Sequence, residues 1–152
     1  MKTDSLSFER NLYIGVPADR LWEGITVPEI VSRYYLTALL EIELYVGSMM
    51  RFESLGMMTI DAQILDLEVG KRLIHSFAFT AETHEGVATD PPTQVSYEIW
   101  PMREMSYLEL RHTGFPGPNR TYQNISAGWD RILCGLKTVL ETGKPLPWPA
   151  RN

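Results

Sequence analysis

The chain of 152 residues contains one cysteine, Cys134, and no long hydrophobic run. A single cysteine cannot form an internal disulfide, which is typical of proteins in a reducing compartment. The N-terminal stretch MKTDSLSFERN lacks the apolar segment of a signal peptide, and no stretch approaches the roughly 20 apolar residues that a membrane span requires. These absences predict a cytoplasmic protein with no membrane partner.

Clustered positive charge is also absent from the sequence. The chain has 14 lysines and arginines against 19 aspartates and glutamates, which gives a formal net charge of −5. A protein that binds nucleic acid presents a basic stripe to the phosphates. We therefore expect no nucleic-acid partner.

Residues that could carry chemistry are few. The histidines are His75, His84 and His112, and none has metal-ligand spacing with cysteine or with another histidine. No serine lies in a nucleophile elbow, and no glycine-rich phosphate loop opens a helix. Glutamates such as Glu41 and Glu43 alternate with apolar residues and should face solvent, so they do not form a catalytic pair. We expect no metal, no cofactor and no catalytic residue.

The composition that remains is that of an ordinary globular protein, with 44% hydrophobic and 22% charged residues. This length can bury a sizeable core without disulfides or metal. No internal repeat or linker divides the chain. The sequence predicts one domain over residues 1–152.

The first part of the chain alternates loosely between apolar and polar residues and predicts a strand over Ser7–Val16. Pro17 suits the first turn of a helix, and Pro28 would end one helix and open the next. These prolines predict two short helices, over Ala18–Thr26 and Pro28–Tyr34.

The middle of the chain changes to a period of two, which predicts about six antiparallel strands. Ile42 and Leu44 alternate with glutamates, Gly47-Ser48 forms a turn, and the next strand carries Met50 and Phe52. A second pair of strands turns near residues 69–72, and a third turns at the PMRE stretch. The polar, proline-containing segment 80–93 is a predicted loop.

The stretch GWDRILCGLKTVLETG predicts a long amphipathic helix near the end of the chain. At about 100° per residue, one arc of roughly 120° carries every large apolar side chain of the helix. The arc consists of Trp129, Ile132, Leu133, Leu136, Val139 and Leu140. Cys134 falls on the opposite, solvent-facing arc. Gly143 suits a left-handed C-terminal cap, Thr121 and Ser126 are alternative N-caps, and Gly128 would permit close backbone approach.

A sheet with one apolar face must cover it, and this helix is the one element long enough to do so. The expected fold is therefore α+β, with a curved antiparallel sheet wrapped around the long C-terminal helix and two short helices after the first strand. The inward alternation of the strands and the helix arc would then face each other across the interior.

Four stretches in this order carry a resemblance to a known family: VPADRLWEGITVPEIVSRYY, ILDLEVGKRLIHSF, LELRHTGF and GWDRILCGLKTVLETG. Together they span Phe8 to Thr142, and the series resembles the activator homologues of the heat-shock protein 90 ATPase. That family belongs to the START-like (SRPBCC, Bet v 1-like) superfamily, whose fold is the helix-grip. The chain departs from it at Tyr34-Tyr35, where the family often has tryptophan and an aromatic, and at Val69, where a proline is common.

The resemblance implies a deep cavity between the sheet and the C-terminal helix, which in many relatives holds an apolar small molecule. Inward alternation and the resemblance together give the expected ligand-binding residues: Trp22, Tyr34, Tyr35, Met50, Phe52, Phe77, Phe79, Tyr97, Leu108, His112, Trp129, Leu133 and Leu136. The phenolic groups of the tyrosines would orient a polar group of the ligand. His112 would lie at the cavity rim bonded to a backbone carbonyl, or contact the ligand, or act as an acid or base.

We therefore expect the chain to bind a small apolar or amphipathic molecule. The alternatives are a protein-interaction module, such as a chaperone-associated stress-response factor, and a cavity enzyme of cyclase or hydrolase type. Inward pairs of carboxylates or histidines would favour the enzyme, and an exposed apolar patch would favour the interaction module. The expected state is a monomer or weak homodimer, with a chaperone as a possible partner. In the family, chaperone activation belongs to relatives with an additional domain.

Overall fold

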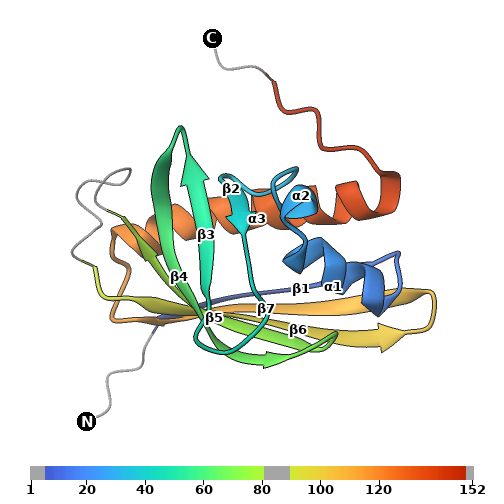
Figure 1. The fold of residues 1–152 in the computed structure, drawn as a ribbon, viewed down its shortest axis with the longest axis horizontal. Coiled ribbons are helices and arrows are strands. Elements are labelled where there is room, and N and C mark those ends of the chain that lie inside the picture. The colour runs from blue at the N-terminus through green and yellow to red at the C-terminus, as the bar shows by residue number, and fades with distance from the viewer. Residues whose placement is uncertain (1–5, 81–89, 150–152) are drawn as a thin grey trace.

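The computed structural model describes residues 6–80 and 90–149, which form a seven-stranded sheet, two short helices and one long helix (Figure 1). In chain order the elements are β1 (Leu6–Ile14), α1 (Ala18–Thr26), α2 (Pro28–Val31), β2 (Ala38–Glu41), β3 (Met49–Ser54), β4 (Met57–Glu68), β5 (Arg72–Phe79), β6 (Thr93–Met102), β7 (Met105–Phe115) and α3 (Arg120–Thr142). The helix-grip fold predicted from the sequence is confirmed, and α1 has the predicted bounds.

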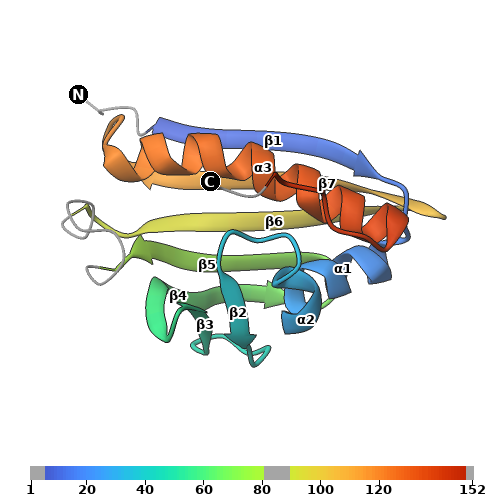
Figure 2. The ribbon, with the colours of Figure 1, turned by 90° about the horizontal axis from the view of Figure 1, so that it is seen from above.

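The sheet has the order β1-β7-β6-β5-β4-β3-β2, and every neighbouring pair is antiparallel. Its strands β1, β6 and β7 run beneath α3, while β3 and β4 rise beside the helix (Figure 1). Seen from above, α3 lies along β1 and β7, and α1 and α2 lie near its C-terminal end (Figure 2). The curvature of the sheet therefore encloses the helix on more than one side.

The core lies between α3 and the concave face of the sheet. The whole predicted apolar arc of α3 is buried, from Trp129 to Leu140. Opposite it, alternate strand residues such as Leu73, Leu108 and Leu110 are fully buried. Burying one such leucine stabilises the fold by roughly 1.5–3 kcal/mol, so this interface supplies much of the folding free energy.

The ends of α3 differ in how well the sequence predicted them. Gly143 adopts the left-handed conformation with φ of 78°, and its N–H donates to the Val139 carbonyl, which confirms the predicted C-cap. The predicted N-caps are wrong, because the helix begins earlier and Asn119 Oδ1 accepts from the Tyr122 N–H at 2.9 Å. Thr121 instead donates through its N–H and its hydroxyl to Asp90.

The strand predicted through Ile42 and Leu44 is wrong beyond Glu41, where β2 ends. The β2–β3 register shifts between Leu39 and Glu41, and the chain then leaves the edge of the sheet. Gly47 donates its N–H to the Ile64 carbonyl of β4 at 2.8 Å, so the connection is longer than the predicted two-residue turn.

Two other predicted segments end at different residues in the structure. The helix predicted over Pro28–Tyr34 is regular only to Val31, and residues 32–34 continue as turns. Most of the predicted loop 80–93 lies outside the described residues, and β6 already includes Thr93. Within the described part of the chain, none of the helices is long and apolar enough to cross a membrane.

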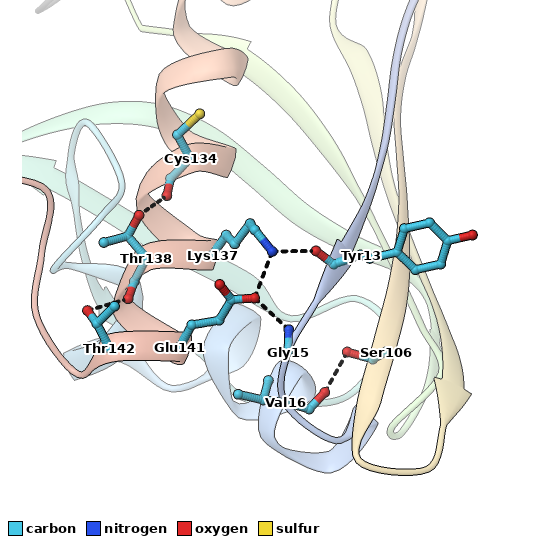
Figure 3. Close-up of polar contacts among 9 residues, drawn as sticks. All are labelled: Tyr13, Gly15, Val16, Ser106, Cys134, Lys137, Thr138, Glu141 and Thr142. Carbon is cyan, nitrogen blue, oxygen red and sulfur yellow. Dashed lines mark hydrogen bonds and ion pairs between the residues drawn. The ribbon is translucent and has the colours of Figure 1, made fainter.

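The C-terminal half of α3 is joined to the end of β1 by polar contacts (Figure 3). Lys137 Nζ donates to the Tyr13 carbonyl at 2.8 Å and pairs with Glu141 at 2.7 Å. The same Glu141 carboxylate accepts from the Gly15 N–H at 2.6 Å, and its hydrogen bond with Lys137 lowers its pKa. These exposed contacts add little stability, but they fix the register of helix and strand. The Cys134 side chain is exposed, as predicted, and points away from them.

Two glycines lie where the N-terminal helices meet α3. A Cβ at Gly135 would lie 2.9 Å from Tyr34 Cβ, and one at Gly24 would lie 2.9 Å from Leu140 Cδ1. The end of the Leu140 side chain could shift, but Tyr34 Cβ is fixed to its backbone, so the segment after α2 approaches α3 only because Gly135 has no side chain. The close approach predicted at Gly128 is wrong, since a Cβ there would meet only Leu36 Cδ1 at 3.4 Å.

Candidate ligand-binding site

A cavity of about 410 Å³ lies between the N-terminal half of α3 and the β3–β5 side of the sheet. Its lining comes from the segment before β2, from three strands and from α3. The lining residues are Tyr35, Leu36, Thr37, Ser54, Thr59, Ile60, Phe77, Phe79, Asn124, Ile125, Gly128, Trp129 and Ile132. This volume is within the range of small-molecule sites in proteins.

The periodicity of α3 explains its side of the cavity. Asn124, Gly128 and Ile132 are four residues apart and share one helix face, and Ile125 and Trp129 lie beside them. Gly128 contributes no side chain at the centre of this face. Because only the Leu36 side chain approaches the position that its Cβ would take, space remains between the helix and the sheet.

Four of the expected ligand-binding residues line the cavity: Tyr35, Phe77, Phe79 and Trp129. The rings of Phe77 and Phe79 meet edge to face, with centroids 5.0 Å apart. The Tyr35 ring meets Trp129 edge to face at 6.1 Å. Such pairs hold the rings in fixed orientations, so the aromatic wall is largely preformed.

The other expected residues are buried but do not line the cavity. They are Trp22, Tyr34, Met50, Phe52, Tyr97, Leu108, His112, Leu133 and Leu136. Alternation along a strand identifies the buried face, but it does not distinguish a filled core from a void. Around the C-terminal half of α3, large side chains occupy the space that the sequence interpretation left open.

His112 is not at the cavity rim, because it is fully buried beneath Trp129. Trp129 Nε1 donates to His112 Nδ1 at 3.0 Å, and His112 Nε2 lies 2.6 Å from the Thr93 hydroxyl. Since indole nitrogen can only donate, His112 carries its proton on Nε2 and donates it to Thr93. Thr93 then donates to the Phe77 carbonyl at 3.2 Å.

This chain of hydrogen bonds occupies both ring nitrogens of His112 with side-chain partners. The predicted bond to a backbone carbonyl is therefore wrong, and no nitrogen is left for a ligand or for proton transfer. These hydrogen bonds instead fix the indole of Trp129, which forms part of the cavity wall.

Both buried histidines are held neutral. Burial and, to a smaller extent, the neighbouring His75 lower the pKa of His112 to about 3. The pKa of His75 is lowered to about 4, because burial outweighs the opposing effect of its hydrogen bond to the Ser76 carbonyl. A charged imidazole in this interior would lose its hydration without gaining a counter-ion. Neither histidine is suited to exchange protons near neutral pH.

The three expected tyrosines are also neutral, because burial raises the pKa of Tyr34, Tyr35 and Tyr97. The Tyr34 hydroxyl donates to the Gly24 carbonyl at 2.7 Å, so it joins the turn after α2 to α1 and is not available to a ligand. Of the three, Tyr35 lines the cavity.

The polar part of the lining was missed from the sequence. Thr37, Ser54 and Thr59 form a wall of three hydroxyls, and Asn124 lies across from them on α3. A helix pattern continued toward the N-terminus would have found Asn124, but the hydroxyls meet only because of the strand pairing. Among the described residues, no charged side chain lines the cavity, and no group of three or more metal-ligating residues occurs.

Comparison of the sequence with known families gives one match that covers most of the chain. Residues 15–141 match the family described as Activator of Hsp90 ATPase homolog 1-like protein. The chain belongs to this family. The sequence matches none of the curated proteins compared with it.

Solved structures of similar fold include proteins of low sequence identity. Protein MLL2253 from Mesorhizobium loti has a TM-score of 0.76 and 20% identity, with 90% of this chain and 97% of that chain covered. PFC0360w, an HSP90 activator from Plasmodium falciparum, has a TM-score of 0.70 and 20% identity, with 90% of this chain and 96% of that chain covered. The Aha1 dimer from Colwellia psychrerythraea has a TM-score of 0.72 and 16% identity, with 91% of this chain and 98% of that chain covered. At these identities the likeness establishes the fold alone.

Proposed function

We propose that this member of the Activator of Hsp90 ATPase homolog 1-like family binds a small apolar or amphipathic molecule in the cavity beside Trp129. The observation that carries the proposal is the cavity itself, which has a volume of about 410 Å³ and a mainly apolar lining. Burial of an apolar ligand against Phe77, Phe79 and Trp129 would supply the binding free energy. The uncharged lining favours a neutral ligand, because a charged group would lose hydration there.

Calorimetric titration with naphthol, a neutral aromatic alcohol, tests this proposal. Binding should show a negative heat-capacity change, because apolar surface is buried. Gly128→Leu places a side chain in the cavity and should abolish binding. Ala127→Leu is the matched control, since Ala127 precedes Gly128 on the exposed side of α3. Equal naphthol affinity in the two folded variants would contradict the proposed site. If naphthol binds at this site, mass spectrometry of small molecules extracted from the purified protein would identify the natural ligand.

A second candidate function is docking of a partner protein, as the interaction-module alternative requires. Leu44, Tyr45, Val46 and Met49 follow one another closely, and each exposes 41–59% of its surface. An exposed apolar group outside the cavity favours protein contact. The description of PFC0360w as an HSP90 activator makes a chaperone the first partner to test. Stimulation of Hsp90 ATPase activity that Val46→Lys removes would support this candidate.

The oligomeric state and location follow as further expectations. The Colwellia psychrerythraea relative is described as a dimer, which agrees with the monomer or weak homodimer expected for this chain. Analytical ultracentrifugation over a range of concentrations would measure the association. A cytoplasmic location stays a prediction from the sequence. No specific observation favours a catalytic function, since the two buried histidines are neutral and enclosed.

A further inference from the structure

The three hydroxyls of the cavity wall converge on one atom. Thr37 Oγ1 lies 2.8 Å from Thr59 Oγ1, 3.1 Å from Ser54 Oγ and 3.2 Å from the Glu53 carbonyl oxygen. Thr37 precedes β2, Ser54 ends β3 and Thr59 is in β4. The pairing of these three neighbouring strands therefore brings Thr37 against two side chains that lie 17 and 22 residues further along the chain.

All three contacts can be hydrogen bonds in only one arrangement of protons. The Glu53 carbonyl has no hydrogen, so Thr37 must donate its single hydroxyl hydrogen to it. Thr37 must then accept in both other contacts, and Ser54 and Thr59 each donate to it. Thr37 has then used its hydrogen and both lone pairs.

This arrangement of protons determines which atoms Ser54 and Thr59 present to the cavity. The Ser54 and Thr59 hydrogens are committed to Thr37, while each of these oxygens keeps two lone pairs. Within residues 6–80 and 90–149, no group donates a hydrogen bond to either oxygen. This wall therefore presents hydrogen-bond acceptors and no donors to a ligand.

The remaining polar groups of the lining do not change this property of the wall. The Trp129 N–H is already donated to His112. The Asn124 amide can donate or accept, so it does not select between ligands. The Tyr35 hydroxyl is not part of the Thr37 cluster, and like the Asn124 amide it can donate or accept, so it does not select between ligands either.

We propose that Ser54 and Thr59 select neutral apolar ligands that carry a hydrogen-bond donor, such as an alcohol, a phenol or an amide N–H. This selectivity rests on the proposed function, because it concerns the same cavity. A ketone or ether places an oxygen lone pair against the lone pairs of the wall, and a carboxylate adds an uncompensated charge. The ligand class is therefore an apolar alcohol or its N–H equivalent, and not a fatty-acid anion.

Calorimetry with three probes on the same ring tests the selectivity: naphthol, methoxynaphthalene and naphthoate. One net hydrogen bond changes affinity by about threefold to tenfold. Wild-type protein should bind naphthol tighter than methoxynaphthalene by that factor, and naphthoate most weakly. Equal affinities for naphthol and methoxynaphthalene, or tightest binding of naphthoate, would overturn the selectivity but leave the proposed function standing. Failure of every probe to bind would overturn both.

Two variants separate this proton arrangement from simple loss of polarity. Thr59→Val removes an acceptor, so the naphthol preference should shrink because naphthol binds more weakly. Thr37→Val frees the Ser54 and Thr59 hydrogens to turn toward the cavity, so the preference should shrink because methoxynaphthalene binds more tightly. An unchanged preference in Thr37→Val would refute the arrangement. Should Thr59→Val fail to fold, Ser54→Ala replaces it, with the same expected loss of naphthol affinity. Should Thr37→Val fail to fold, Thr37→Ala replaces it, with the same expected gain in methoxynaphthalene affinity.

Discussion

The buried histidines predict a steep loss of stability in mild acid. The pKa of His112 is about 3 and that of His75 about 4, against 6.5 for an exposed histidine. Between these values the unfolded chain binds protons that the folded chain does not. The free energy of unfolding therefore rises with pH, by about 1.4 kcal/mol per pH unit for each histidine. This contribution is complete above about pH 6.5 and is lost as the pH falls toward the folded pKa values.

The size of the effect follows from the same values. From pH 7 to pH 4.5, each histidine should lower the free energy of unfolding by about 2.5 kcal/mol, or about 5 kcal/mol together. Domains of this kind are commonly stable by only about 5–15 kcal/mol, so the protein should lose roughly a third or more of its stability by pH 4.5. Protonation would also remove the acceptor of the Trp129 N–H, which gives a structural cause for the low pKa of His112.

Urea denaturation followed by tryptophan fluorescence at several pH values measures this slope. His112→Gln and His75→Gln each remove one titrating group, so each should reduce the slope by about 1.4 kcal/mol per pH unit between pH 4.5 and 6. The slope is compared rather than the absolute stability, because either substitution also disturbs packing. A wild-type stability that stays constant over this range, or single variants that keep the full slope, would refute the reasoning.

The glycines of α3 and its cysteine give two further predictions. Gly135→Ala should destabilise the protein by about 1–3 kcal/mol in urea denaturation, because its Cβ would lie 2.9 Å from Tyr34 Cβ. Gly128→Ala is the control and should be neutral or stabilising by up to about 1 kcal/mol, as expected for alanine in a helix; equal losses would disprove the packing argument. Cys134 is exposed, so it should react with a thiol reagent in the native protein almost as fast as in urea, and protection would mean that this face is covered.

The elements with strong periodicity could be predicted from the sequence. The α3 arc and the Gly143 cap depend on local spacing and on one residue that tolerates positive φ, so both follow from a short stretch of chain. The Asn119 cap did not follow from the sequence, because threonine and serine are also good N-caps. In the structure Thr121 is not the cap, and its N–H donates to Asp90. That contact joins residues far apart in the sequence.

The candidate site was predictable in kind but only partly in its residues. Strand alternation correctly identified Phe77 and Phe79 as inward-facing, the helical arc did the same for Trp129, and all three line the cavity. It could not identify the hydroxyl wall, because Thr37 lies outside any regular element and Thr59 reaches Thr37 only through strand pairing. It also could not predict the fate of His112, whose partners come from β6 and α3.

The placement of the void within the fold has a physical reason in the two halves of α3. Toward its C-terminus, Leu136 and Leu140 meet Gly24 of α1, and Gly135 lets Tyr34 approach the helix backbone. The helix α1 and the turn after α2 therefore pack directly on this half, and side chains fill the interior. Toward the N-terminus, Gly128 is not opposed by any backbone atom within the described residues, and the nearest side chain is that of Leu36. Glycine therefore has opposite effects in the two halves of α3. At Gly135 the backbone of another segment packs against the helix and the interior is filled, whereas at Gly128 no backbone approaches and a cavity remains.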